Sequence, residues 1–208
     1  MQLTHKMIKK SVIKSQHTQR NWDLTREIPQ EDIDILIHAV KNCPSKQNFA
    51  FYNAHFITNR NIIEEVHNNS YGLGYLNDDG ERVECTNPQV LANLLIVFEE
   101  AKMSEAYWKK WQDRDFSQEK IHDRDMHTAI GIAAGYVNVL ATMLDMETGC
   151  CACYDIAKVK EIIGLERTPI LLMGVGYKDL NRQRREHHTD NVMIPRREKE
   201  NINVNIIL

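Results

Sequence analysis

The sequence has no strong excess of charge of either sign. Its 26 lysine and arginine residues against 29 aspartate and glutamate residues give a formal net charge of -3 at pH 7. A chain without a global basic field is not expected to bind nucleic acid or an anionic membrane surface through its overall electrostatics. Any basic cluster that binds an anion must therefore be identified locally.

The sequence also lacks a disulfide framework and a long apolar run. It has five cysteines, an odd number, and three of them are crowded at Cys150, Cys151 and Cys153. This spacing favours free thiols in a reducing compartment. No apolar run is expected to reach the roughly 20 residues of a membrane span, and the N-terminal lysines lie within an amphipathic pattern rather than ahead of an apolar stretch. We therefore expect a cytoplasmic protein.

A chain of 208 residues that is 42% hydrophobic can bury one core, and nothing divides it, so we expect a single domain over residues 1–208. The apolar spacing predicts both helices and strands. Helices are predicted over residues 3–16, 29–43, 59–66, 101–124, 127–146 and 155–163, strands over 49–57, 91–98 and 170–177, and loops over 68–88 and 149–155.

Two short polar motifs follow the first two predicted helices. Residues 17–23 read HTQRNWD and residues 44–48 read PSKQN. Arg20 offers a fork of donors for a phosphate or a ring carbonyl, Thr18 offers a hydroxyl, and Asn48 both donates and accepts. These are the groups that a flavin mononucleotide (FMN) requires. Taken singly, each motif is also an ordinary solvated or helix-ending turn.

Taken together and in this order, the motifs resemble those of the nitroreductase family of FMN enzymes. The first motif of that family is, in order, a basic residue, Ser or Thr, any residue, Arg or Lys, any residue, an aromatic residue and Asp, which residues 17–23 match. Its second motif is Pro-Ser-Ser-x-Asn followed by an aromatic residue, here Tyr52. Further segments resemble the family's central helix, flavin-edge loop, following helix, last core strand and basic tail: residues 131–141, 149–155, 159–165, 169–177 and 195–197.

The resemblance implies an α+β fold, nitroreductase-like, with a central, mainly antiparallel β-sheet flanked by helices. It also implies an intertwined homodimer. The small residues of the 131–141 helix allow close helix approach, including approach of the partner subunit. Residues 178–208 would form a C-terminal arm, and the alternating apolar residues near its end would add a strand to the partner's sheet. These residues are Ile202, Val204, Ile206 and Ile207.

The resemblance assigns cofactor-binding roles to residues from five parts of the chain. His17 and Thr18 would contact the phosphate and ribityl chain, and Arg20, Arg196 and Arg197 would supply cations for the phosphate and flavin edge. Pro44, Ser45, Lys46 and Asn48 would reach the flavin of the other subunit. Gln89, with Asn87, would support the ribityl chain or ring edge, and Ala152 and Cys153 would bring a backbone N–H toward flavin N5.

The sequence departs from the family pattern in two of these places. Gln16 stands where family members usually carry arginine, which removes one charge from the expected phosphate site. Lys14 or His17 could compensate for that charge. Lys46 replaces a small serine, and its ammonium could face the flavin or the solvent.

The resemblance implies an FMN-dependent oxidoreductase in which NADH or NADPH delivers hydride to the flavin and a small acceptor then takes it, in a ping-pong exchange. The acceptor would be a nitroaromatic, a quinone or an enone. No side chain need act as a catalytic acid or base, because the flavin carries the chemistry. Alternatives are same-fold flavin enzymes of dehalogenation, azoline dehydrogenation or flavin breakdown, and a non-catalytic flavin-binding protein.

Two further features admit more than one interpretation. Tyr107, Trp108 and Trp111 lie where the family carries mobile helices over the substrate pocket, but they could equally serve as core or dimer packing. The three crowded cysteines with His187 or His188 could hold zinc. Adjacent cysteines are poor chelate spacing, so we expect no metal site and no catalytic thiol.

Overall fold

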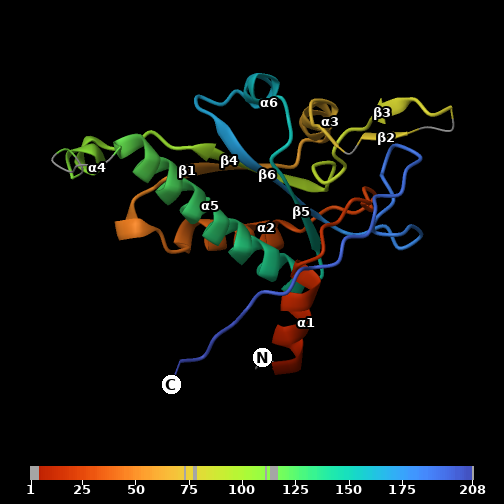
Figure 1. Cartoon of the computed structure of the whole chain (residues 1–208), viewed down its shortest axis with the longest axis horizontal. Helices are drawn as coiled ribbons and strands as arrows, with labels where there is room; N and C mark the ends of the chain where they lie inside the picture. Colours follow the sequence, from red (N-terminus) through yellow and green to blue (C-terminus); the bar gives the residue numbers. More distant parts are fainter. Residues whose placement is uncertain (1–4, 73, 77–78, 111, 113–116, 208) are drawn as a thin grey trace.

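The computed structural model describes residues 5–72, 74–76, 79–110, 112 and 117–207 (Figure 1). The helices are α1 (His5–Ser15), α2 (Gln30–Asn42), α3 (Arg60–Asn68), α4 (Glu105–Lys109), α5 (Gln118–Met143) and α6 (Ile156–Ile163), with a short 3₁₀ turn η1 (Lys46–Asn48). The strands are β1 (Tyr52–Ile57), β2 (Gly74–Leu76), β3 (Arg82–Glu84), β4 (Leu94–Glu100), β5 (Glu147–Cys151) and β6 (Pro169–Gly176).

A four-stranded antiparallel sheet in the order β1-β4-β6-β5 forms the centre of the molecule. The nearly continuous apolar run of β4 is explained by burial on both faces. Ile96 and Phe98 pack toward α2 and α5, whereas Leu95 and Val97 pack into a second cluster with α3 and α6. Figure 1 shows these two helix pairs on opposite sides of the sheet. The expected α+β architecture with a mainly antiparallel sheet is confirmed.

Helix α5 is longer than the sequence predicted and begins nine residues earlier. The Ser117 side chain caps it by accepting a hydrogen bond from the Lys120 backbone N–H. The predicted helix 101–124 is therefore divided: its last residues belong to α5, and its earlier part holds the short helix α4. By length and composition alone, α5 is the one described helix that could cross a membrane. Its buried residues, such as Ile130 and Val137, pack against the sheet, as in a core helix.

Two predicted loops contain strands. Residues 68–88 hold the β2–β3 hairpin, whose turn includes Gly80 with a φ of +79°. Residues 149–155 begin with the end of β5, because Gly149 lies opposite Gly174 of β6 and the pairing continues to Cys151. Conversely, the predicted strand 49–57 begins only at Tyr52. Gln47 and Asn48, just before it, have φ angles of 55° and 60° and turn the chain.

Several apolar side chains lie on the surface of the single chain. Helix α1 exposes Val12 and Ile13, by 53% and 58%, and α5 exposes Tyr136. A Cβ added at Gly131 or Gly135 would meet no atom within 4 Å in the described part of the chain. The alternating residues of the tail, Ile202, Val204, Ile206 and Ile207, are 75% to 95% exposed and form no strand here. The homodimer and its strand exchange therefore stay predictions.

Candidate functional site

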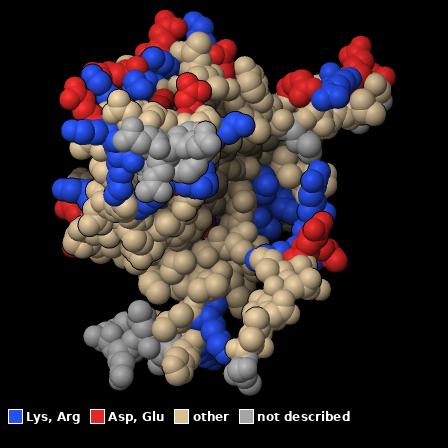
Figure 2. All heavy atoms as spheres, turned by 60° about the vertical axis from the view of Figure 1, so that its left-hand side comes forward, with Lys and Arg blue, Asp and Glu red and all other residues tan. Residues whose placement is uncertain are grey.

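A cavity of about 1160 Å³ lies where the first motif meets the segments before β4 and after β6. Its lining comes from residues 16–18, 20, 71–72, 87–89, 184–185 and 194–199, together with Cys153. Lysine and arginine side chains gather around a hollow beside the extended C-terminal segment (Figure 2). The cavity therefore collects positive charge from parts of the chain that are distant in sequence.

The first motif is fixed to the edge of the sheet. Thr18 bridges Thr148 of β5, and the next backbone N–H, of Gln19, donates to the Thr148 carbonyl at 2.8 Å. Trp22 is fully buried, and its ring N–H donates to the carbonyl of Pro88 at 2.7 Å. This anchoring places His17, Thr18 and Arg20 along the cavity wall, and their role in binding a cofactor stays a prediction.

Two arginines of the cavity converge on one backbone carbonyl, and a third lies near them. Arg184 Nη1 donates to the carbonyl of Thr18 at 2.7 Å, and Arg20 Nη1 approaches the same oxygen at 3.4 Å. Arg185 Nη1 donates to the carbonyl of Ile194 at 2.9 Å. Burial lowers the pKa of Arg20, and the positive charges of Arg184 and Arg185 lower it further. Like charges held this close disfavour one another's charged form, and an anion placed among them would relieve that repulsion.

Arg196 and Arg197, which were predicted to bind the cofactor, also line the cavity. Arg184 and Arg185, which sequence reasoning missed, lie there as well. Their signal was a basic run at residues 182–185 in a chain of negative net charge. The charge missing at Gln16 is not restored by Lys14, because Lys14 pairs with Asp145 at 3.1 Å and Glu147 at 3.4 Å.

Gln89 reaches the cavity because two glycines let its backbone lie against the sheet. A Cβ at Gly174 would stand 2.0 Å from the Gln89 carbonyl oxygen, and one at Gly149 would stand 2.9 Å from the Gln89 Cβ. The Gln89 Oε1 atom is buried and has no hydrogen-bond partner in the described residues. The amide of Asn87, by contrast, donates to Cys151 Sγ at 3.0 Å. Gln89 Oε1 is therefore a buried acceptor that the described residues leave without a donor.

The segment after β5 contributes one of its two predicted residues. Cys153 lines the cavity, whereas Ala152 does not. The Cys153 backbone N–H donates weakly to Cys151 Sγ at 3.3 Å, and its carbonyl accepts from Tyr71 N–H at 2.8 Å. Burial raises the pKa of Cys151 to about 11, so its thiol is protonated at neutral pH and is a poor nucleophile.

The second motif does not meet the cavity within one chain. Pro44, Ser45, Lys46 and Asn48 are absent from the described cavity lining. Lys46 Nζ instead pairs with the buried carboxylate of Asp125 at 2.6 Å, so its ammonium faces α5. The Ser45 hydroxyl donates to the Phe49 carbonyl at 2.8 Å. A role for this motif at the other subunit's site stays a prediction.

The aromatic residues before α5 divide between core and surface. Tyr107 is 1% exposed and packs edge-on against Phe49 and Phe51, while Trp108 is half-buried beside His122. The interpretation of Tyr107 as core packing is therefore correct. Trp111 lies outside the described residues.

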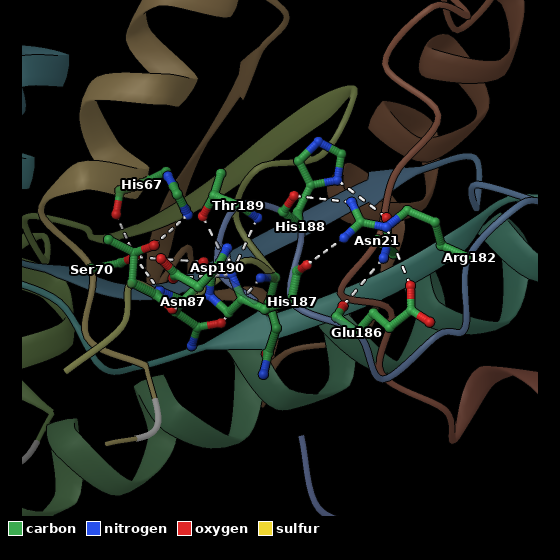
Figure 3. Close-up of polar contacts among 12 residues, drawn as sticks. Asn21, His67, Ser70, Asn87, Arg182, Glu186, His187, His188, Thr189 and Asp190 are labelled. Carbon is green, nitrogen blue, oxygen red and sulfur yellow. Dashed lines mark hydrogen bonds and ion pairs between the residues drawn. The ribbon is translucent and has the colours of Figure 1, made fainter. Parts of the chain in front are cut away.

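A buried polar network lies behind the cavity (Figure 3). His187 is fully buried, its Nε2 is 2.7 Å from the Thr86 carbonyl, and its Nδ1 accepts from the Asp190 backbone N–H at 3.0 Å. The His67 ring bonds the Thr86 hydroxyl at 2.7 Å. Among the described residues, one group has the composition of a metal site, Cys85, His187 and Asp190, and it includes none of the three crowded cysteines. Both ring nitrogens of His187 are engaged in hydrogen bonds, so we interpret this residue as a structural link between its own segment and Thr86.

Residues 13–177 match the model of the nitroreductase family, so the chain belongs to this family and the resemblance is confirmed. Solved structures with the same fold share little sequence. A Staphylococcus epidermidis protein assigned as an NAD(P)H:FMN oxidoreductase is 14% identical, with a TM-score of 0.62 over 94% of this chain and 95% of that one. A Bacillus subtilis protein assigned as a nitroreductase is 12% identical, with a TM-score of 0.63 over 96% and 97%.

A third structure, of a Clostridium acetobutylicum protein assigned as an NADH oxidase, is 19% identical, with a TM-score of 0.54 over 90% of this chain and 94% of that one. At these identities the likeness shows the nitroreductase-like fold alone. No curated protein sequence matches this chain. The four arginines that follow β6 and line the cavity lie beyond the residues that match the family: Arg184, Arg185, Arg196 and Arg197.

Proposed function

We propose that this protein is an FMN-dependent oxidoreductase that transfers hydride from NADH or NADPH to a small organic acceptor, such as a nitroaromatic, a quinone or an enone. The observation that carries the proposal is the cationic cavity of a nitroreductase-family chain. Seven of the residues predicted to bind the cofactor line it together: His17, Thr18, Arg20, Gln89, Cys153, Arg196 and Arg197. The printed names of two structural neighbours, an NAD(P)H:FMN oxidoreductase and an NADH oxidase, support the same chemistry.

The residues of the cavity fit an FMN. Its phosphate requires cations, and no carboxylate within the described residues forms an ion pair with Arg20, Arg196 or Arg197. Arginine suits this role because its planar donors bind phosphate in pairs. The unpaired Gln89 Oε1 would accept a hydrogen bond from the ribityl chain or the ring edge.

When bound, FMN would supply the redox chemistry of a ping-pong exchange between the nicotinamide and the acceptor. The chain's own residues would hold the ligands and set the electrostatics. The Arg20 guanidinium, whose charge is disfavoured by burial and next by the neighbouring cations, would stabilise negative charge on the bound ring. The Cys151 thiol, with a pKa of about 11, would take no part.

The functional unit that we propose is a homodimer. Pro44, Ser45, Lys46 and Asn48 would complete the site of the partner subunit. This role is supported by their position away from the cavity of their own chain. The exposed apolar residues of α1 and the open face at Gly131 and Gly135 also favour a partner. We further propose a cytoplasmic location, because the crowded cysteines suit a reducing compartment.

The proposal is tested by purification and a visible spectrum. We expect a yellow protein that releases one FMN per subunit on denaturation and elutes as a dimer by light scattering. Rapid mixing with NADH or NADPH should bleach the flavin absorbance, and an added quinone or nitroaromatic should restore it. A protein that binds no flavin would refute the proposal.

Other results of the same experiment identify the alternatives. Bound FMN that neither nucleotide reduces indicates a flavin-binding protein without this activity. Reduced FMN that no quinone, nitroaromatic or enone reoxidises indicates another flavin chemistry on the same fold, such as dehalogenation, azoline dehydrogenation or flavin breakdown. A monomer that holds stoichiometric FMN would refute the shared site alone.

A further inference from the structure

The segment of residues 182–194 forms a fixed wall of the cavity. The Asn21 side chain donates to the Glu186 carbonyl at 3.3 Å, and Arg182 donates to the His188 carbonyl at 3.0 Å. The fully buried His187 is hydrogen-bonded to the Thr86 carbonyl, which ties the segment to the rest of the protein (Figure 3). Side chain to backbone bonds of this kind, several of them partly buried, hold an irregular segment in one arrangement. The arginines that it carries are therefore held in position.

Arg184 and Arg185 are the two arginines that this wall presents to the cavity. Arg184 donates one hydrogen bond to the Thr18 carbonyl, and Arg185 donates one to the Ile194 carbonyl. These bonds orient the two guanidinium groups and leave their other donors available. Neither has a carboxylate partner within ion-pair distance among the residues that the structure describes. They are oriented cations without an anion.

The charge of the cavity exceeds what one FMN phosphate balances. Six lysine and arginine side chains line it, against one carboxylate, that of Glu198. A phosphate monoester carries about two negative charges at neutral pH. If one of these arginines takes the place of the arginine missing at Gln16, the cavity still holds more positive charge than the phosphate balances. The volume of about 1160 Å³ is also above the roughly 300 to 1000 Å³ of a pocket for one small ligand.

We propose that Arg184 and Arg185 form a second anion subsite in this cavity, which binds a phosphate or carboxylate group of the reactant that meets the flavin. Two sources have this chemistry: the 2′-phosphate of NADPH, which NADH lacks, and an acidic group on the acceptor. The inference rests on the proposed function, because it presumes that FMN occupies the cavity. It adds that the enzyme selects charged reactants.

The test compares Arg184→Gln, Arg185→Gln and the double variant with Lys178→Gln in the FMN-loaded protein. Lys178 is an exposed cation of the same C-terminal arm that does not line the cavity, so it controls for loss of charge alone. The dissociation constant of FMN is measured by fluorescence titration. KM is measured for NADPH and NADH, and for a nitroaromatic carboxylate and its neutral amide.

We expect the double variant to raise KM for NADPH, or for the carboxylate acceptor, by roughly ten- to a hundred-fold, as for a lost charged hydrogen bond. KM for NADH and the neutral amide should stay within about threefold, which is below 1 kcal/mol. The reactant whose KM rises identifies the source of the anion. The Lys178→Gln control should match the wild type.

Two results would overturn the inference alone. Weaker FMN binding with every KM unchanged would mean that both arginines serve the flavin phosphate in place of Gln16. No change in any constant would mean that they are solvated cations. A wild-type protein that binds no FMN would refute the proposed function as well, and the titration distinguishes this case from the other two.

Discussion

The central sheet and the cavity wall differ in how far their side chains find partners within the protein. In β4, Leu94 to Phe98 are fully buried, and alternate side chains fill two separate apolar clusters. In the cavity wall, Arg20, Arg184 and Arg185 are brought together although their charges repel, and the Gln89 Oε1 atom is left without a partner among the described residues. The sheet packs its apolar side chains against one another, whereas the cavity wall leaves charged and polar groups that a ligand could pair with.

This difference separates what stabilises the protein from what gives it function. Burial of apolar surface in the sheet supplies the favourable free energy of folding. The clustered arginines cost part of it, and the cost is recovered only when an anion binds. Substitutions in the two regions should therefore change different measurements, and the following predictions test that separation from the largest effect to the smallest.

A large-to-small substitution in the sheet should reduce stability most. Leu95 is fully buried, so Leu95→Ala should lower the free energy of unfolding by about 2 to 5 kcal/mol through lost burial and a residual cavity. Urea denaturation at a fixed protein concentration measures this change. Leu180→Ala, at a residue that is 82% exposed, is the control and should stay within about 0.5 kcal/mol. A Leu95→Ala protein as stable as this control would show that the sheet is not the stabilising region.

Substitutions in the cavity should instead weaken FMN binding. Arg20→Ala or Arg196→Ala should cost about 1.5 to 3 kcal/mol of binding free energy, or roughly ten- to a hundred-fold in the dissociation constant. The FMN-free Arg20→Ala protein should be at least as stable as the wild type, because the repulsion from Arg184 and Arg185 is relieved.

Fluorescence titration and thermal unfolding provide the two measurements. Arg82→Ala is a suitable control, because Arg82 is an exposed residue of the β2–β3 hairpin away from the cavity. Unchanged FMN affinity in both cavity variants would place the phosphate site elsewhere.

The network behind the cavity should make stability depend on pH. Burial, and next the neighbouring His187, lower the pKa of His67 to about 4 from an ordinary value near 6.5. Between these two values the unfolded chain binds a proton that the folded chain does not. Stability is therefore present above about pH 6.5 and is lost as the pH falls toward 4. Between pH 7 and pH 5 the loss should be about 2 kcal/mol.

Urea denaturation at the two pH values measures this loss, and a His67→Asn variant provides the comparison. Its stability should change less between pH 7 and pH 5 than that of the wild type. An equal change in both proteins would assign the pH dependence to other groups.

The smallest effect is expected from the thiols near the cavity. Replacing Cys150, Cys151 and Cys153 with serine should leave flavin reduction by NADH or NADPH within several-fold, because the flavin carries the electrons and the Cys151 thiol is protonated. Rapid-mixing kinetics on the FMN-loaded variant measures this rate. Abolished turnover with FMN still bound would make the thiols redox partners of the flavin.

The sequence predicted the elements whose residues carry a clear period. α2 and α6 were expected within one or two residues of their observed ends, and β6 was shifted by only one residue. The β2–β3 hairpin was missed because its three-residue strands pair, within the described part of the chain, only with each other. β5 was missed because Gly149 and the cysteines after it have little strand pattern of their own, and pairing with β6 makes them a strand.

The candidate site was predictable where a local motif carried it. His17, Thr18 and Arg20 follow one another in sequence, and the fixed spacing of the family motif identifies them. Arg184 and Arg185 have no such motif. Their role as cavity residues depends on where the 182–194 segment is held.

The sequence by itself therefore determined the family, the two-sided burial of β4 and the polar character of the first motif. These properties follow from residue type and short-range spacing, which the chain carries wherever it is placed. Only the tertiary structure decided which cations share one cavity. The bond from Arg184 to the Thr18 carbonyl joins residues 166 positions apart, and a contact of that length exists only after the sheet has brought both segments to the same edge.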